Sequence, residues 1–534
     1  MLQSCCIWQP QLGSGNLYNL SPADLVFTMT TLTSALPVVA QAEQYRSRTA
    51  IIDSERCFTY AELLGSSARI AAALLGARSD LHEERVAFLV APSFLWAATL
   101  WGIWRAGGVA VPLPLGTPAP ELEYILDDTR ATAVLFDAAA EGLVAPLARQ
   151  RGIRELSTAD VLTLEPSRLP QVGPDRRAMI LYTSGTTSRP KGVVTTHNNI
   201  AAQITALVEA WQWTSDDRVL LCLPLHHVHG IINVVSCALW SGATCEMLPR
   251  FDASEVLQRI ASGLLTLFMA VPTVYTKLIA AWEAASPEYK AAITQGCSQM
   301  RLMVSGSAAL PVATLERWKQ ISGHTLLERY GMTEIGMALS NPLHGQRVPG
   351  SVGIPLPTVK VQLVNEAGDL VEPGAPGEIE VRGPSVFKEY WGKSDATRDA
   401  FRDGWFRTGD TALLERGVYR ILGRTSIDII KTGGHKVSAL EIEEVLRQHP
   451  AIADCAVVGV PDPEWGERVA VAVVLGQNAS NDALDLDTLR AWAKERLAIH
   501  KVPSRLLTLA ELPRNAMGKV TKPAVGKLFT STSE

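Results

Sequence analysis

The chain has 534 residues, more than the roughly 250–300 at which a single hydrophobic core stops growing, so we expect two or three domains. Hydrophobic residues make up 47% and charged residues 19%, which excludes a disordered or collagen-like protein. The net charge is −5 and the basic residues are scattered, which argues against a nucleic-acid partner and favours a small molecule.

Neither the first segment of the chain nor its eight cysteines indicates a secreted protein. The first 28 residues contain no Lys or Arg, so a secretory or transit peptide is not indicated, and Met29 is a second candidate start. The cysteines show no spacing typical of a zinc site or a disulfide framework. We therefore expect a cytoplasmic protein, with residues 1–34 as a poorly ordered extension.

From about residue 48 to 377, short apolar strands alternate with amphipathic helical stretches. RTAIID at 48–53 is followed by a helical pattern at 59–77, and LTLFMAVP at 265–272 is followed by another at 273–285. This order predicts βαβ units, in which parallel sheets carry helices on their faces.

The run from Val86 to Trp104 is uncharged and long enough to cross a membrane. Pro92 divides it, however, and Pro interrupts a helix. We predict a buried strand, a helix that begins after Ser93, and a second strand from Val109, and hence no membrane span.

The last third of the chain changes character twice. A section rich in Gly and Pro at 371–391 predicts a small β-rich subdomain, and a hinge is expected at 424–428. The predicted fold is therefore α/β. A large domain at 35–424 is built from parallel βα sheets with the β-rich subdomain, and a small mobile α+β domain follows at 425–534.

The stretch MILYTSGTTSRPKG begins at Met179 as an apolar strand and then opens into hydroxyl and glycine residues. Backbone N–H groups and hydroxyls in such a turn can form an anion nest, and Lys191 can supply positive charge for phosphate oxygens. The spacing of a Walker A loop is absent, and a polar surface turn is the alternative interpretation. The candidate phosphate-binding residues are Thr183, Ser184, Gly185, Thr186 and Thr187.

Further motifs follow in order: ERYGMTEIG at 328–336, GWFRTGD at 404–410, GRTSIDIIKTGGHKVSALEIE at 423–443 and PRNAMGKVTK at 513–522. With the phosphate loop they resemble the adenylate-forming superfamily of acyl-CoA synthetases, peptide-synthetase adenylation domains and luciferases. The resemblance covers about residues 35 to 525 and is strongest to malonyl-CoA synthetases. It implies an enzyme that joins a carboxylic acid, malonate above others, to ATP and then to coenzyme A, with Mg²⁺.

The resemblance assigns catalytic roles to residues of these motifs. Lys519 would lie between the carboxylate of the acid and the α-phosphate, because two anions must approach each other there. Glu334 would hold Mg²⁺ together with Thr186, whereas taken alone it would mark a helix start. Thr333 and Lys191 complete the expected catalytic set.

The nucleotide and CoA contacts are implied in the same way. Tyr330 and Gly331 would flank the adenine, Asp410 would accept the ribose hydroxyls, and Arg424 would contact ribose or phosphate. Ser426 stands where many relatives carry an Asp or Lys hinge residue. A swing of the C-terminal domain would then bring the KTGG segment to the thiol channel. Its candidate CoA-binding residues are Gly433, Gly434 and Lys436.

Arg301 is the predicted determinant of which acid is used. It begins an otherwise apolar strand, where an unpaired charge is costly. One interpretation pairs it with a protein carboxylate. The resemblance to malonyl-CoA synthetases favours another, in which its guanidinium clamps the distal carboxylate of a dicarboxylic acid. The rest of the predicted pocket consists of His229, Thr273, Ser305 and Met332.

Other functions stay open at this point. One is a ligase for a fatty or aromatic monocarboxylic acid, with Arg301 merely structural. Another is an inactive nucleotide-binding scaffold, although all the expected catalytic residues are present, and a third is a domain that loads a carrier protein. We expect a monomer or homodimer. Malonyl-CoA synthetases also occur in mitochondria, which makes that compartment the alternative to the cytoplasm.

Overall fold

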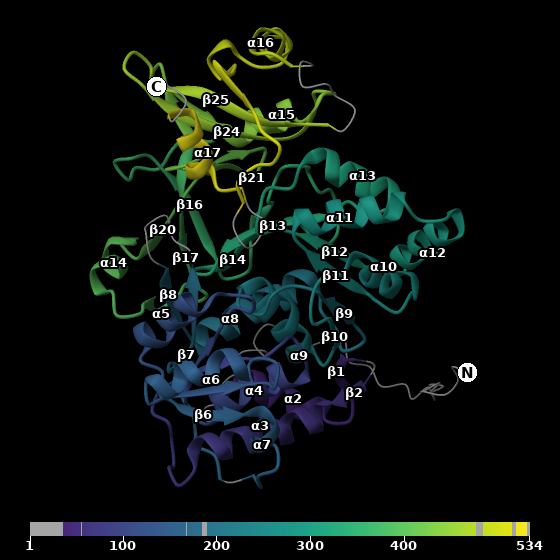
Figure 1. The fold of residues 1–534 in the computed structure, drawn as a ribbon, viewed down its shortest axis with the longest axis vertical. Helices are drawn as coiled ribbons and strands as arrows, with labels where there is room; N and C mark the ends of the chain where they lie inside the picture. The colour runs from purple at the N-terminus through teal and green to yellow at the C-terminus, as the bar shows by residue number, and fades with distance from the viewer. Residues whose placement is uncertain are drawn as a thin grey trace.

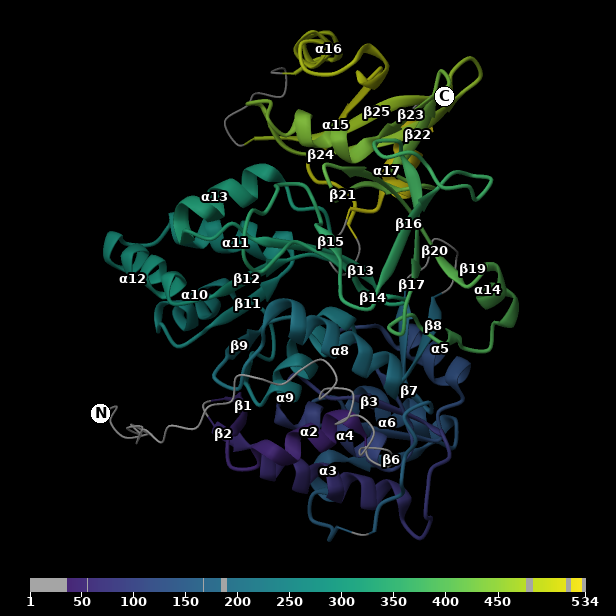
Figure 2. The same ribbon diagram turned by 180° about the vertical axis from the view of Figure 1, so that it is seen from behind.

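The structure is a computed structural model. It describes residues 36–54, 56–166, 168–183, 190–476, 484–514 and 520–530. Several predicted features fall outside the described residues, namely the extension at 1–34 and the site residues Ser184, Gly185, Thr186, Thr187 and Lys519. Figures 1 and 2 show the N-terminal layers at one end of the molecule and the C-terminal sheet at the other.

Two large sheets, mostly parallel, form the N-terminal body. The nine-stranded sheet has the order β15 (Ile354–Pro355), β14 (Gly336–Ser340), β13 (Leu327–Met332), β12 (Leu302–Ser305), β11 (Leu267–Ala270), β9 (Arg218–Leu221), β10 (Thr244–Met247), β1 (Thr49–Asp53) and β2 (Arg56–Thr59). The seven-stranded sheet has the order β18 (Glu389–Tyr390), β8 (Lys191–Thr196), β7 (Arg177–Thr183), β4 (Val109–Pro112), β3 (Arg85–Leu89), β5 (Ala133–Phe136) and β6 (Arg154–Ser157). Antiparallel pairing is confined to the margins of both sheets.

Helices cover both faces of each sheet, as the βα alternation predicts. Between the sheets lie α3 (Tyr60–Leu75), α4 (Phe94–Arg105), α8 (His197–Trp211), η2 (His229–Ser236) and α9 (Cys237–Ser241). The outer face of the nine-stranded sheet carries α10 (Ala253–Ala261), α11 (Pro272–Glu283), α12 (Pro287–Ser298) and α13 (Val312–Ser322). The outer face of the other sheet carries α5 (Ala119–Thr129) and α6 (Glu141–Gln150). The smaller elements are α2 (Pro37–Ala42), η1 (Glu43–Tyr45), α7 (Thr158–Val161) and α14 (Ser394–Asp399).

Strand alternation explains this layering. In β3, Val86 and Phe88 point into the core between the sheets, whereas Ala87 and Leu89 point to the outer core beneath α5 and α6. The uncharged run at 86–104 therefore folds as predicted, into β3 and α4, and β4 follows from Val109. Among the described helices, none is both long and apolar enough to cross a membrane.

The β-rich subdomain and the C-terminal unit each have their own sheet. The former pairs β16 (Lys360–Val364), β17 (Gly377–Arg382), β20 (Trp405–Glu415) and β19 (Phe401–Arg402), with β21 (Val418–Arg424) beside β20. The latter pairs β23 (His435–Ser438), β22 (Ile429–Thr432), β25 (Gly466–Leu475) and β24 (Ile452–Asp462), with β26 (Arg505–Thr508) beside β25. Its helices are α15 (Ala439–Leu446), α16 (Leu486–Lys494), η3 (Ile499–Lys501) and α17 (Lys522–Thr530).

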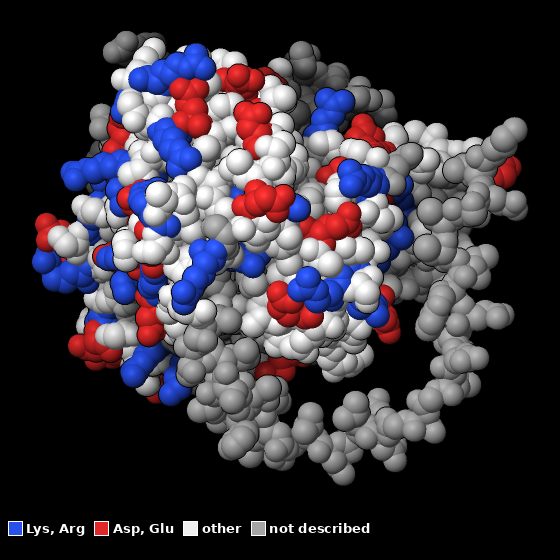
Figure 3. All heavy atoms as spheres, turned by 90° about the horizontal axis from the view of Figure 1, so that it is seen from below, with Lys and Arg blue, Asp and Glu red and all other residues white. Residues whose placement is uncertain are grey.

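The chain passes from one of these sheets to the next between β21 and β22, across residues 425–428. This connection coincides with the hinge expected from the sequence, although a domain boundary at 424/425 stays a prediction. Figure 3 views the N-terminal layers from below and shows acidic and basic side chains interspersed over that face.

Arg301 lies at the amino end of β12, and the prediction that it clamps a substrate is wrong. Its guanidinium is held by Asp217, with Nε 2.8 Å from Oδ1 and Nη2 2.6 Å from Oδ2, while Nη1 donates to the carbonyl of Trp211. Asp217 precedes β9 and also accepts from the hydroxyl of Thr266, which precedes β11. The pair thus joins the amino ends of parallel strands, whereas ligands bind at the carboxyl ends.

Replacement of Arg301 by Ala is expected to lower the free energy of unfolding by about 2–3 kcal/mol. The buried carboxylate of Asp217, 3% exposed, would lose its partner, and the partial exposure of Arg301 keeps the loss below that of a fully buried pair. Urea unfolding measures this change. Arg317→Ala, which removes an exposed ion pair with Glu283, is the control and should cost less than about 1 kcal/mol. A stable Arg301 variant with weakened acid binding would contradict this assignment.

Glu328 in β13 should make stability depend on pH. Burial raises the pKa of its carboxyl to about 8, and nearby Glu444 adds to the rise while the N–H of Gly350 opposes it. The folded chain therefore keeps a proton that the unfolded chain releases. Stability should fall as the pH rises from about 4.5 to 8, by up to about 1.4 kcal/mol per unit. Urea unfolding at pH 6, 7 and 8 should show a flatter profile for Glu328→Gln, and equal slopes would contradict the shift.

Candidate active site

The described site residues of the N-terminal body gather around the carboxyl ends of β12 and β13 and the turn between β13 and β14. Figures 1 and 2 show β13 and β14 between the N-terminal layers and the C-terminal sheet. This edge is where parallel α/β sheets place their ligands. The turn at 333–335 carries Thr333 and Glu334 and joins two antiparallel strands, so it is not a helix start.

Tyr330, Asp410 and Arg424 form a hydrogen-bonded chain across two sheets. The hydroxyl of Tyr330 in β13 donates to Oδ2 of Asp410 in β20 at 2.6 Å, and Nε of Arg424 in β21 donates to Oδ1 at 3.2 Å. Burial raises the pKa of the Tyr330 hydroxyl well above its usual range, and the carboxylate adds to this effect. Tyr330 therefore remains a hydrogen-bond donor, and Asp410 is a fixed, buried acceptor near this edge of the sheet.

Glu334 lies next to this chain and contacts the phosphate-loop strand through Tyr390. Its side chain is 8% exposed, and Oε1 accepts a 2.9 Å hydrogen bond from the hydroxyl of Tyr390 in β18. The ammonium of Lys191 lies over the ring of Tyr390, 5.0 Å from its centroid. Burial raises the pKa of Glu334, while the Tyr390 hydrogen bond and Arg424 oppose the rise. In the part of the chain that the structure describes, Glu334 forms no ion pair.

Two close approaches define the backbone here. Thr183 and Lys191 are paired across β7 and β8 and so mark the two sides of the predicted phosphate loop. A Cβ on Gly331 would lie 2.1 Å from the carbonyl oxygen of Gly336, so only glycine fits at this point of the β13–β14 hairpin. This glycine is required by the hairpin itself, and the role of Gly331 as a nucleotide contact stays a prediction.

A second buried cation, Arg329, lies beside Tyr330 and was not singled out from the sequence. Its side chain is 3% exposed, and Nη2 donates to the hydroxyl of Ser307 at 3.3 Å. The same hydroxyl lies 3.3 Å from Nδ1 of His229, at the start of η2. Burial lowers the pKa of Arg329 to about 9 and that of His229 well below its usual range.

This cluster carries several buried polar atoms without a hydrogen-bond partner among the described residues: Arg329 Nε, His229 Nε2 and Ser305 Oγ. Arg329 also forms no ion pair within the described ranges. Gly306 leaves room for its guanidinium, because a Cβ there would lie 2.6 Å from Cζ. A buried guanidinium without a carboxylate is costly, so the cluster is suited to an anionic ligand.

The other predicted pocket residues are less closely joined. Met332 ends β13, next to the turn that holds Glu334, and is partly buried. Thr273 lies exposed in the first turn of α11, at the carboxyl end of β11. Their contact with a substrate stays a prediction. The signal that the sequence offered for Arg329 is a pair of neighbouring charged residues, Glu328 and Arg329, in the buried half of β13.

The predicted CoA-binding residues lie in the β22–β23 hairpin of the C-terminal unit. Gly433 and Gly434 form its two-residue turn with φ of +54° and +79°, a conformation that glycine adopts without strain. The ring of Trp465 would lie 2.8 Å from a Cβ on Gly433. Lys436 pairs with Glu366, which follows β16, at 2.8 Å. The hairpin therefore packs beside the β-rich subdomain in this arrangement.

The sequence matches two described families. The AMP-binding enzyme family matches residues 38–391, and the AMP-binding enzyme C-terminal domain matches residues 441–519. The chain is 47% identical to the malonate–CoA ligase ACSF3, mitochondrial, of Mus musculus over 91% of this chain and 90% of that one. It is 39% identical to the malonate–CoA ligase of Arabidopsis thaliana, over 91% and 87%.

The structure is likewise similar to a solved one. It superposes on ATP-bound MatB from Rhodopseudomonas palustris with a TM-score of 0.85 and 34% sequence identity, over 93% of this chain and all of that chain. The family match at 38–391 spans both large sheets and the residues that surround Glu334. The chain therefore belongs to the AMP-binding enzyme family, as a CoA ligase of the adenylate-forming type.

Proposed function

We propose that the chain joins malonate to coenzyme A at the expense of ATP, forming malonyl-CoA, AMP and diphosphate. The observation that carries this proposal is Arg329 in β13, a buried cation that forms no ion pair with a carboxylate among the described residues. A dicarboxylic acid has one carboxylate to react and a second to pair with this guanidinium. The names of the relatives in mouse and Arabidopsis support the same acid.

In the first step, an oxygen of the malonate carboxylate attacks the α-phosphorus of ATP, and the bond from that phosphorus to the bridging oxygen of diphosphate breaks. Asp410 would accept the ribose hydroxyls, Tyr330 would flank the adenine, and Arg424 would hold ribose or phosphate near the connection. Lys519, outside the described residues, would supply the charge between the two anions. The phosphate loop with Thr183 and Lys191 would bind the leaving diphosphate.

A Mg²⁺ ion fits the donor set at Glu334. The described residues offer no cluster of three or more metal-ligating side chains, and a single buried carboxylate beside phosphate oxygens is a common protein contribution to a magnesium site. Glu334 would be this ligand, with Thr186 as the predicted second. When bound, the ion would neutralise charge on the phosphates.

In the second step, the CoA sulfur attacks the carbonyl carbon of the adenylate, and the bond to the phosphate oxygen of AMP breaks. The β22–β23 hairpin, with Gly433, Gly434 and Lys436, would line the path of the thiol after a rotation about the connection at 425–428. The side chains of Lys436 and Glu366 are 52% and 73% exposed, so their ion pair is a weak contact that rotation can break.

Arg329 takes over the role that the sequence suggested for Arg301. Arg329→Met should lower kcat/KM for malonate by about thirtyfold or more, because one substrate carboxylate loses its partner. Diphosphate release would be measured with malonate, methylmalonate, acetate, octanoate and coumarate, each with and without CoA. Wild-type preference for malonate supports the proposal. A wild type that prefers a monocarboxylic acid, or an Arg329 variant with unchanged malonate kinetics, contradicts it. Arg347→Met is the matched control.

Arg347 is a suitable control because, within the described chain, its guanidinium donates only to backbone carbonyls, those of Pro342, Thr325 and Leu343. It is thus a second partly buried arginine without a carboxylate, but outside the cluster of His229 and Ser305. Its replacement should reduce stability and leave the ratio of malonate to acetate kcat/KM unchanged.

Tyr390→Phe should slow adenylate formation by about three- to tenfold in kcat, the usual weight of one hydrogen bond. The variant keeps the ring below Lys191 but removes the hydroxyl that orients Glu334. Diphosphate release at varied Mg²⁺ concentration measures the effect, which should include a higher Mg²⁺ requirement. The control Tyr419→Phe loses a hydroxyl whose described acceptor, the carbonyl of Val361, is 3.5 Å away. Unchanged kinetics for Tyr390→Phe would exclude this orienting role.

The mitochondrion is the compartment that the vertebrate relatives' names support, in place of the cytoplasm expected from the first residues. Fractionation of cells that express the full chain, followed by protease protection, tests this placement. A monomer or homodimer stays the prediction for the oligomeric state, which sedimentation measures directly.

A further inference from the structure

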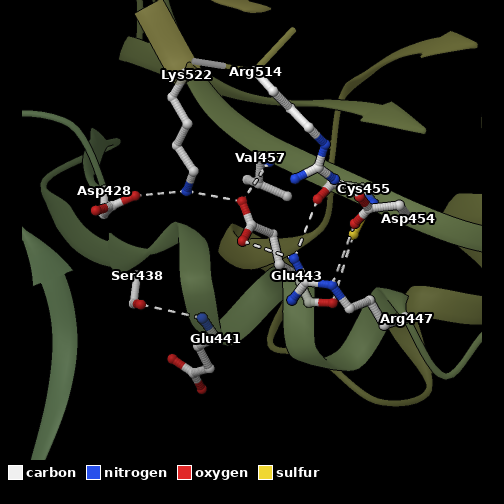
Figure 4. A network of polar contacts seen from close by, with 10 residues as sticks. All are labelled: Asp428, Ser438, Glu441, Glu443, Arg447, Asp454, Cys455, Val457, Arg514 and Lys522. Carbon is white, nitrogen blue, oxygen red and sulfur yellow. Dashed lines mark hydrogen bonds and ion pairs between the residues drawn. The ribbon is translucent and has the colours of Figure 1, made fainter. Parts of the chain in front are cut away.

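Lys522, at the start of α17, is a buried cation that the proposed mechanism does not use. Its ammonium lies 2.6 Å from Oδ1 of Asp428 and 2.8 Å from Oε1 of Glu443, and its side chain is 10% exposed (Figure 4). Glu443 in α15 is fixed in turn, because the same oxygen accepts from the N–H of Val457 at 2.8 Å and Oε2 faces Arg447 at 3.4 Å. The lysine therefore joins two carboxylates from separate elements.

The Asp428 side of this network leads to the nucleotide site. Oδ2 of Asp428 accepts from the backbone N–H of Arg424 at 3.0 Å, and its own N–H donates to the Arg424 carbonyl at 2.7 Å. The side chain of Arg424 pairs with Asp410. Gly423 admits this arrangement, since a Cβ there would lie 2.3 Å from Cβ of Asp428. Polar contacts thus run without interruption from Asp410 to Lys522.

The other side leads to the segment that carries Lys519. The chain on both sides of 515–519 is tied together, because Arg514 and Val520 form a β-bridge and the N–H of Thr521 donates to the carbonyl of Pro513 at 2.8 Å. Arg514 also pairs with Asp454 in β24 at 2.5 Å (Figure 4). Lys522 lies three positions after Lys519 in the sequence, and its ion pairs anchor the chain just beyond Val520.

We propose that Lys522 is a positioning residue for adenylate formation, because it fixes the segment of Lys519 relative to Arg424 and Asp410. The inference rests on the proposed function, since it assigns Lys519 to the first half-reaction. Lys522 bridges the connection at 425–428 and the core of the C-terminal unit, so the start of α17 and the connection are held in a fixed position relative to each other. Small displacements of a catalytic group reduce rates strongly, whereas a purely stabilising ion pair would affect both half-reactions alike.

The two half-reactions of the full-length enzyme separate these possibilities. Lys522→Met should lower kcat for malonate-dependent diphosphate release by about tenfold or more. Conversion of preformed malonyl-adenylate and CoA to malonyl-CoA should change by less than about threefold. Lys522→Arg keeps the positive charge, so its rate of diphosphate release should lie above that of Lys522→Met. Lys527→Met, an exposed lysine in the same helix, is the matched control with both rates unchanged.

A double-mutant cycle tests whether Lys522 acts through Lys519. Adding Lys522→Met to Lys519→Ala should reduce adenylate formation no further, within about twofold, because the group that it positions is already absent. If Lys522→Met does not fold, Asp428→Asn replaces it. The amide keeps the shape of the side chain and an oxygen that can accept from the backbone N–H of Arg424, but it loses the ion pair with Lys522. The variant should lower the rate of adenylate formation by about three- to tenfold.

Each outcome has a separate meaning. Normal adenylate formation by a folded Lys522→Met, equal losses in both steps, or a loss that adds to that of Lys519→Ala overturns the inference and leaves the proposed function intact. Full activity of Lys519→Ala overturns the catalytic assignment on which the inference rests. Absence of malonate turnover by the wild type overturns the proposed function itself, and the cycle is then carried out with the acid that the wild type accepts.

Discussion

The hydrogen-bonded chain of Tyr330, Asp410 and Arg424 is the constraint on which the rest of the structure depends. It joins the nine-stranded sheet to the β-rich subdomain and reaches the last residue of β21, where the connection to the C-terminal unit begins. A carboxylate buried with two fixed donors cannot move without loss of both hydrogen bonds. The site is therefore rigid at Arg424, beside the connection at 425–428 about which the C-terminal unit would have to turn.

Two buried ionisable groups at the site, Arg329 and Glu334, form no ion pair within the described chain. Most buried charges of the described chain are paired within the protein, as Arg301 is with Asp217 and Lys522 with Asp428 and Glu443. Among the residues that the structure describes, Arg329 and Glu334 instead form hydrogen bonds to neutral groups only. Such groups are costly in the folded chain, and ligands of opposite charge offset that cost on binding. We therefore propose that an anion at Arg329 and a cation at Glu334 complete the site.

The acid pocket shows where inference from sequence failed and why. Arg301 precedes an apolar strand and Arg329 lies between Glu328 and Tyr330 in another strand, and neither the pattern nor the spacing says which arginine has a protein partner. Asp217 lies 84 positions before Arg301, so their pairing exists only once β9, β11 and β12 lie side by side. The direction of parallel strands then places Arg301 at the amino edge and Arg329 at the carboxyl edge of one sheet.

The sequence by itself determined the α/β class, the order of strands and helices in most segments, and the family, because hydrophobic periodicity and contiguous motifs are local properties. The tertiary structure alone decided which charges are satisfied. Tyr390 approaches Glu334 and Lys522 approaches Asp428 across 56 and 94 positions, distances over which no periodicity extends. Ion pairs and hydrogen bonds act over a few ångströms, so their partners are fixed only when packing brings remote strands together.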